Sequence, residues 1–188
     1  MTADMVVPAW MHQQVTAGQY ASWTEEQRTG IEIVDGMIVV GPSAPKRHNR
    51  LARLLANALD GVAGPTWNAD TGFDVRLGDL PLSNRRPDVT VYRAETIDVA
   101  PTRPEHVRLV VEVVSPGSET TDRIVKADQY AKADIQFYWR VEQLVTGAPV
   151  VYTYVLDAAT SRYRDGEVFT GVVKMTSPFA VEVDLGQI

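Results

Sequence analysis

Two acidic residues lie inside strongly apolar segments of the sequence. Asp88 opens the segment D-V-T-V-Y directly after a proline, where it could also simply turn the chain, and Glu112 lies in the middle of L-V-V-E-V-V. A carboxylate among valines is costly to bury unless it is paired, hydrogen-bonded or bound to a cation. Because both apolar segments are predicted strands, the two acids are candidates for one shared cation site.

Magnesium is a cation whose coordination suits such a pair. It prefers oxygen ligands and is commonly bound by one or two carboxylates, with water and substrate phosphate completing its shell. Asp88 and Glu112 would supply the carboxylates, and the backbone carbonyl of Val113 would add a third ligand. A metal there would lower the pKa of a bound water and neutralise charge on a phosphate. Lys126, on the helix predicted to follow, would then stabilise charge or position water.

Ordinary ion pairs account for the same side chains. Glu112 could be paired with Arg86 or Arg108, although V-V-E-V-V offers it no polar neighbour in the sequence. Lys126 lies four residues after Asp122, a spacing that suits an ion pair on one helix face. From spacing alone, both the metal site and the ion pairs therefore remain open.

Length and composition favour a single globular domain. The chain has 188 residues, enough to bury a sizeable core, and 45% of them are hydrophobic and 22% charged. It contains no cysteine, which excludes disulfides, thiolate metal sites and cysteine nucleophiles. Residues 1–20 lack the pattern of a signal peptide, and no segment approaches the length of a membrane span. We therefore expect a cytoplasmic protein that does not enter a membrane.

The charge pattern lowers the expectation of nucleic-acid binding without removing it. A net charge of -6 argues against a general polyanion binder, yet 14 of the 18 basic residues are arginine, which suits bidentate phosphate contacts. Four basic residues cluster on a predicted helix over residues 46–60: Lys46, Arg47, Arg50 and Arg53. A solvated basic face is the first explanation for any one of them, and their clustering leaves a surface that faces phosphate as the alternative.

The remaining pattern predicts an α/β domain. Residues 1–30 are expected to form an arm or short helix, and residues 31–188 a single domain. Asp35-Gly36 lies between two β-rich runs and predicts a hairpin. The nearly continuous apolar run over residues 107–114 predicts a central strand covered on both faces. Residues 78–86 form a predicted polar loop.

Two predicted helices carry apolar stripes that would face the sheet. The first stripe consists of Leu51, Leu54, Leu55 and Ala58, and the second, on a helix over residues 121–133, consists of Ile124, Ala127, Ala131 and Ile135. Short strands follow toward the end of the chain, over residues 150–156, 162–164, 167–175 and 179–185.

Several stretches of the chain resemble one known family. P-D-V-T-V-Y, L-V-V-E-V-V-S-P-G-S-E-T-T-D-R-I-V-K-A-D-Q-Y-A and F-Y-W-R-V look like the Uma-two family of restriction-endonuclease-like proteins, which belongs to the PD-(D/E)xK nuclease superfamily. E-I-V-D-G-M-I-V-V-G-P-S-A-P-K-R-H and S-P-F-A-V-E-V-D-L also resemble its pattern, so the similarity covers about residues 31–188. The combination of Glu-Val-x-Ser-Pro with Asp-x-x-x-Lys is the fairly specific part.

The resemblance implies a restriction-endonuclease-like fold, a mixed β-sheet flanked by helices, here with a β-rich C-terminal extension. It implies that Asp88 and Glu112 are the acids that bind Mg²⁺ or Mn²⁺. The lysine of the superfamily normally lies two residues after the second acid, where this chain has Val114. In this family a lysine on the following helix, here Lys126, is thought to take the role.

Two further residues match positions of the family pattern. Glu32 lies on the predicted hairpin and His48 at the start of the first long helix. Glu32 could equally pair with an arginine, and a surface or helix-start role would also explain His48. The resemblance adds both to the candidate catalytic residues.

Two classes of function follow from these observations. The first is a magnesium-dependent endonuclease that hydrolyses DNA, with a homodimer as the expected assembly because two sites serve a duplex. The second is a catalytically inactive module that binds nucleic acid or protein on a nuclease scaffold, since a fold does not fix a function. Hydrolysis of RNA or a nucleotide is a further alternative. A serine nucleophile at Ser115 or Ser118 is disfavoured, because neither has a G-x-S-x-G motif around it.

Overall fold

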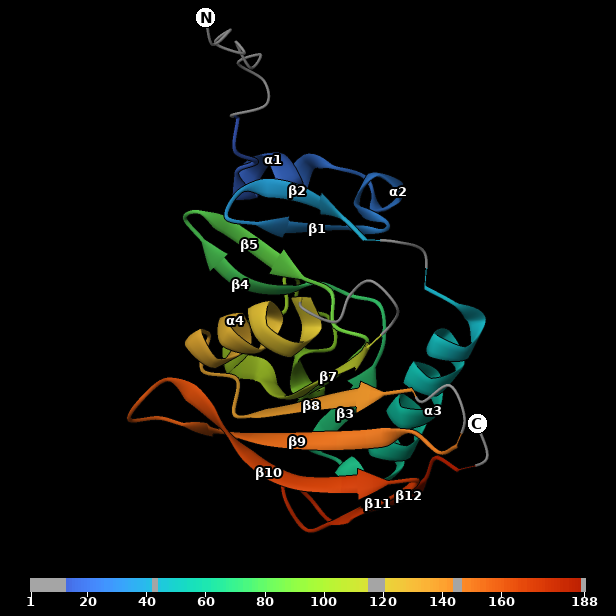
Figure 1. Ribbon diagram of the computed structural model, residues 1–188. Helices are drawn as coiled ribbons and strands as arrows, with labels where there is room; N and C mark the ends of the chain where they lie inside the picture. Colours follow the sequence, from blue (N-terminus) through green and yellow to red (C-terminus); the bar gives the residue numbers. More distant parts are fainter. Residues whose placement is uncertain (1–12, 42–43, 115–120, 144–146, 187–188) are drawn as a thin grey trace, which may run out of the picture.

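A computed structural model of the protein describes residues 13–41, 44–114, 121–143 and 147–186, with the backbone alone for residues 121–123 (Figure 1). The candidate nucleophiles Ser115 and Ser118 and the side chain of Asp122 lie outside this description. The model confirms the predicted fold class. Its helices pack around a mixed sheet, and a smaller antiparallel sheet lies beside it.

The main sheet has six strands in the order β10-β9-β8-β7-β6-β3. Strands β7 and β8 run parallel to each other, and every other neighbouring pair is antiparallel, so the sheet is mixed. Its strands are β3 (Trp67–Asp70), β6 (Val89–Arg93), β7 (Val107–Val114), β8 (Phe137–Glu142), β9 (Val150–Asp157) and β10 (Arg162–Thr170).

Strand β7 is covered on both faces, as its apolar sequence predicts. Alternate residues of a strand point to opposite faces. Val111 and Val113 belong to the larger core cluster, which includes helix α3 (Lys46–Ala63). Val110 belongs to the opposite cluster, which includes Tyr130 of helix α4 (Ala127–Lys132). The two helices therefore pack on opposite faces of the sheet.

A second sheet, in the order β2-β1-β5-β4, forms the other layer of the domain. The predicted hairpin at Asp35-Gly36 is confirmed, with both residues at positive φ, 50° and 79°. The predicted polar loop over residues 78–86 is wrong, because it contains a strand in which the polar side chains of Asn84 and Arg85 are buried. The strands are β1 (Ile31–Val34), β2 (Met37–Val40), β4 (Val75–Asp79) and β5 (Leu82–Arg85).

Two short helices, α1 (Ala17–Ser22) and α2 (Glu25–Arg28), precede this second sheet. Tyr20 of α1 is buried against Ile33 and Leu82 on one face of the sheet. Single 3₁₀ turns at Ala94–Thr96 and Pro104–His106 lie in the connection between β6 and β7. The domain boundary near residue 30 stays a prediction.

The helical stripes are predicted only in part. Leu51 and Leu55 of α3 are buried as expected, but Leu54 and Ala58 are half-buried. The expectation that Ile124 faces the sheet is wrong, since its side chain is 64% exposed. The reason is a π-helical segment over Thr121–Lys126. A π-turn contains more residues than an α-turn, so it rotates the residues before it away from the α-helical stripe.

The predicted β-rich C-terminal extension is largely part of the domain itself. Strands β9 and β10 complete the main sheet, and only β11 (Val172–Met175) and β12 (Val181–Asp184) form a separate pair. The predicted break at Asp165-Gly166 is a bulge within one strand. Glycine is required there because a Cβ on Gly166 would lie 2.6 Å from the Thr153 hydroxyl oxygen. No helix in the described part of the chain is long and apolar enough to cross a bilayer.

Candidate active site

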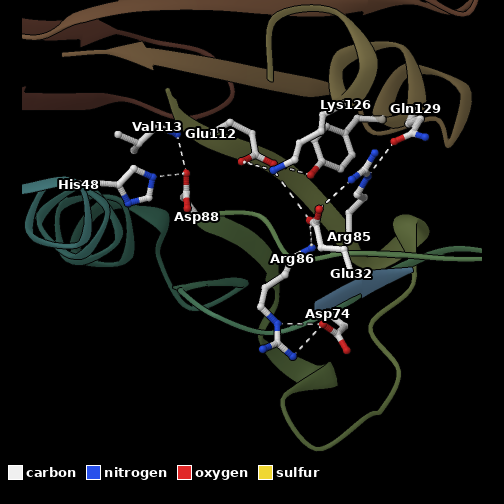
Figure 2. A network of polar contacts seen from close by, with 11 residues as sticks. Glu32, His48, Asp74, Arg85, Arg86, Asp88, Glu112, Val113, Lys126 and Gln129 are labelled. Carbon is white, nitrogen blue, oxygen red and sulfur yellow. Dashed lines mark hydrogen bonds and ion pairs between the residues drawn. The ribbon is translucent and has the colours of Figure 1, made fainter. Parts of the chain in front are cut away.

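The two predicted acids lie side by side on neighbouring strands. Val89 of β6 pairs with Val111 of β7, so Asp88, just before β6, continues the register next to Glu112. The backbone N–H of Val113 donates to Asp88 Oδ2 at 2.7 Å. This bond ties the Asp88 carboxylate to the end of β7, where Figure 2 shows the two acids between His48 and Lys126.

Glu112 is the most deeply buried acid of the site, with 1% of its surface exposed. Lys126 Nζ lies 3.0 Å from Glu112 Oε2, and the Tyr130 hydroxyl donates to Glu112 Oε1 at 2.6 Å. The two arginines considered as ion-pair partners of Glu112 have other contacts. Arg86 binds Asp74, and Arg108 donates to Gln136. Burial, first, and the charge of Glu112 raise the pKa of the Tyr130 hydroxyl well above its ordinary value. The hydroxyl therefore stays a hydrogen-bond donor to Glu112.

Lys126 reaches this site from the last residue of the π-helical segment. Its side chain is 12% exposed, and its ammonium group lies 3.0 Å from Glu112 and 3.8 Å from Glu32 Oε1. Two carboxylates from different sheets thus hold one cation. The arrangement fixes the ammonium beside Glu112.

Glu32 joins the second sheet to this site. One of its oxygens accepts from Arg85 Nη1 at 2.7 Å, and the other accepts from the backbone N–H of Arg86 at 2.8 Å. Arg85 also donates to Gln129 at 2.8 Å. Glu32 therefore pairs with an arginine, as its alternative interpretation holds, and in the same position it also faces Lys126.

His48 lies in the first turn of α3 and is largely buried. Its Nε2 lies 3.1 Å from Asp88 Oδ2, which places the ring inside the site and not on the free surface. Burial alone would lower the pKa of His48, but the hydrogen bond and charge of Asp88, with a contact to the Val113 backbone, raise it overall. The contact with Asp88 thus favours the protonated form of the His48 ring.

The donor atoms suit a hard divalent cation. In the described ranges, no group of three or more histidine, aspartate or glutamate residues forms a closed metal cage. Magnesium does not require one, because it commonly binds one or two carboxylates and keeps several waters. Asp88 and Glu112 offer two carboxylates from adjacent strands, so this pair fits such an ion.

The sequence analysis missed four residues of this network. Tyr130 lies four residues after Lys126, and this spacing on a helix could have placed it on the same face. Arg85 and Asp74 lie in segments whose sequence is typical of loops or weak strands. The sequence therefore did not predict the contacts of Arg85 with Glu32 or of Asp74 with Arg86. Gln129 carries no recognisable pattern. The structure brings all six predicted site residues together (Figure 2): Glu32, His48, Asp88, Glu112, Val113 and Lys126.

A mixed sheet flanked by helices, with acids on two adjacent strands, is the arrangement of restriction-endonuclease-like proteins. The model of the Uma2 family, described as "Putative restriction endonuclease", matches residues 17–184, and the chain belongs to this family.

A solved structure of low sequence identity shares the fold. It is described as "a putative nuclease belonging to DUF820" from Anabaena variabilis ATCC 29413. The TM-score is 0.64 at 17% identity, over 91% of this chain and 95% of that chain. A comparison with curated proteins finds no match. The family supports a nuclease, a hydrolase whose substrate is a nucleic acid, and the solved structure supports the fold.

Proposed function

We propose that the protein is a magnesium-dependent endonuclease that hydrolyses phosphodiester bonds of DNA. The observation that carries this proposal is the buried Glu112 carboxylate, which lies beside Asp88 and 3.0 Å from the ammonium group of Lys126. Two acids and a lysine in this arrangement match the chemistry of metal-assisted phosphodiester hydrolysis. The family description agrees with that reaction class.

The side chains of the site have distinct roles in this proposal. Asp88 and Glu112, with the carbonyl of Val113, would hold Mg²⁺ or Mn²⁺. The bound ion would supply charge to the phosphate and lower the pKa of a coordinated water. Lys126 would stabilise the charge that develops on the phosphate, which is usually the largest catalytic effect.

Three further residues keep this arrangement in place. His48 Nε2 lies 3.1 Å from Asp88 Oδ2 and holds that carboxylate in place. Tyr130 orients Glu112 from the buried side. Glu32 holds Lys126 from the second sheet and is itself held by Arg85. We assign Glu32 and Tyr130 as positioning residues, since their contacts are with other side chains of the site.

The basic face of α3 is the proposed contact for the DNA backbone. Lys46, Arg47, Arg50 and Arg53 are all exposed on the helix that carries His48 into the site. Local cations can bind phosphate although the whole chain carries a net charge of -6, because affinity depends on the charges near the backbone. Preference for DNA over RNA is part of the proposal.

A homodimer is the proposed assembly, with β2 as its contact. All four residues of this strand, Met37–Val40, are apolar and exposed, and β1 is its one neighbour among the described strands. An exposed apolar edge strand offers free backbone groups for pairing with another chain. Two copies of β2 can pair antiparallel about a twofold axis without bringing like charges together.

Cleavage of plasmid and of linear DNA with Mg²⁺ or Mn²⁺ tests the reaction. The variants Asp88→Ala, Glu112→Ala and Lys126→Ala should each abolish cleavage while circular dichroism shows a folded chain. Lys132→Ala is the matched control, because Lys132 lies one helix turn and a half further on and is exposed in an ion pair with Asp128. If the wild type cuts no substrate with either metal, the proposed reaction is wrong.

The non-catalytic module is a second candidate, and one observation favours it. Both acids already have cationic or donor partners within the chain, His48 for Asp88 and Lys126 for Glu112. Titration with Mn²⁺ separates the two functions. A nuclease should bind the ion with an affinity that Asp88→Asn removes, whereas a binding module should show no difference between the two proteins.

A further inference from the structure

A cavity separate from the candidate active site lies between α1, the second sheet and the connection that follows β6. Its volume is about 610 Å³, within the range of small-molecule sites. Five side chains of the candidate active site do not line it: Glu32, His48, Asp88, Glu112 and Lys126. Its lining includes Tyr20, Arg28, Phe73, Asn84, Tyr92 and Val99.

Two hydrogen-bond donors at this cavity lack an acceptor within the described chain. Asn84 is 1% exposed, and its Oδ1 accepts from Arg76 Nε at 3.1 Å, but its Nδ2 has no partner there. Arg28 Nε is likewise buried without an acceptor among the described residues. Buried polar groups are normally hydrogen-bonded, so an unpaired donor in a cavity wall points to a ligand that brings acceptor atoms.

One cation of the lining, Arg28, favours an anionic group on that ligand, while the lining acids other than Glu25 are already bound. Asp74 is already bound by Arg86 and by the Tyr20 hydroxyl, and Asp70 accepts from Tyr92. Arg28 contacts the Ala21 carbonyl and the Tyr20 ring and forms no ion pair with a described residue. Its guanidinium is therefore available to a phosphate or carboxylate, for which its geometry is suited.

Another part of the lining suits a planar ring. Phe73 and Tyr92 pack edge to face with ring centroids 5.3 Å apart, and Ile97 and Val99 form an exposed apolar rim. Aromatic and apolar walls with a few placed polar groups are typical of sites for heteroaromatic ligands. A molecule with an aromatic face, acceptor atoms on its edge and an anionic group satisfies all three features.

We propose that this cavity binds a nucleoside monophosphate. Its base lies against Phe73 and Tyr92 with an acceptor on Asn84 Nδ2, and its phosphate lies at Arg28. The site is distinct from the acid pair and does not depend on a divalent metal. It goes beyond the proposed nuclease function, since binding there would hold even in a chain that cleaves nothing.

Calorimetric titration of the full chain with AMP, GMP, CMP and UMP in EDTA tests the proposal. At least one nucleotide should bind saturably at one site per chain, with a Kd below about 1 mM, more tightly than its nucleoside or inorganic phosphate alone. Absence of saturable binding by all four overturns the proposal. Equal affinity for inorganic phosphate overturns it as well, because the base would then contribute nothing.

Substitutions in the cavity wall test whether the nucleotide binds in this cavity. Val99→Trp narrows the cavity at an exposed position and should weaken binding at least tenfold. Val172→Trp is its matched control, since the two valines are 48% and 46% exposed and only Val99 lines the cavity. Asn84→Asp keeps the acceptor for Arg76 but removes the free donor, and should weaken binding in a folded protein. Unchanged affinity in Val99→Trp overturns the site.

One more variant separates this site from the nuclease centre. Lys126→Ala should leave nucleotide affinity unchanged, because Lys126 does not line the cavity. Loss of binding in Lys126→Ala would move the nucleotide to the acid pair and overturn the separate site. A wild type that cleaves DNA but binds no mononucleotide would overturn this inference alone, and one that binds the nucleotide without cleaving DNA would overturn only the nuclease.

Discussion

Replacing Lys126 by methionine should both destabilise the fold and stop catalysis. Lys126 Nζ lies 3.0 Å from Glu112 Oε2, and Glu112 is almost fully buried. Removing one partner of a buried ion pair costs about 3–5 kcal/mol. We expect about 3 kcal/mol, the lower end of that range, because the Tyr130 hydroxyl still donates to the other oxygen of Glu112. For a chain of this length, the loss corresponds to a fall in Tm of about 6–12 °C.

A double-mutant cycle with Glu112→Gln separates the two effects. In Glu112→Gln, Lys126 keeps Glu32 as an acidic neighbour at 3.8 Å, so we expect a smaller loss of about 1–2 kcal/mol. The protein with both substitutions has no unpaired buried charge. Its loss of stability should therefore be smaller than the sum of the single losses, by about 0.5–3 kcal/mol.

Urea unfolding in EDTA measures the stabilities, and plasmid cleavage with Mg²⁺ measures the activity of the same four proteins. Every variant should cleave at least about 100-fold more slowly than wild type. The double variant should regain stability relative to the sum without regaining cleavage. Lys126→Met with wild-type stability would refute the ion-pair argument. Wild-type cleavage in that variant would refute the catalytic role, and cleavage rescued in the double variant would reduce Lys126 to a structural partner of Glu112.

Three further outcomes are expected. Burial and the hydrogen bond to Asp74 raise the pKa of Tyr20 from 10.0 to about 12, so its stabilisation is complete below pH 10 and is lost as the pH rises through 12. In urea unfolding across this window, wild type should lose stability more steeply than Tyr20→Phe, and parallel curves would contradict the assignment. Ile38→Lys on the exposed edge of β2 should convert a dimer to a monomer in sedimentation velocity, whereas Val168→Lys, equally exposed on β10, should leave the dimer intact. Arg50→Ala should reduce the slope of log affinity for DNA against log salt by about 0.9, and Arg162→Ala, exposed on β10, should not change it.

Sequence patterns identified most of the elements that carry the site. Strand β7 could be predicted because a strand covered on both faces must be apolar along its whole length, apart from a residue with a special role. Glu112 could be recognised as a candidate site residue for the same reason, because burying a charged side chain in an apolar strand costs free energy. The hairpin at Asp35-Gly36 could be predicted because few residue pairs tolerate positive φ at both positions of such a turn.

The contacts around the acids could not be predicted, because they join segments far apart in the chain. Glu32 and Arg85 lie on neighbouring strands of the second sheet, and β5 was hidden by its polar composition. Its buried Arg85 is held by Glu32 and Gln129, which lie far away in the sequence, so no local pattern records these contacts. Exposure of Ile124 follows from the π-helical segment, which an analysis at α-helical spacing does not anticipate.

The π-helical segment carries Lys126, the residue proposed to take the role that the superfamily pattern gives to a lysine on the strand. Glu112 and Val114 are two residues apart on β7, so their side chains point to the same face. A lysine at position 114 would reach Glu112 along that face. Here Val114 is buried, and Lys126 comes to the same carboxylate from the element packed over it. Tyr130, four residues later, binds the other oxygen. Two residues four positions apart, Lys126 and Tyr130, thus contact the two oxygens of Glu112, and in the proposed site Lys126 would supply the charge that the superfamily pattern places on the strand.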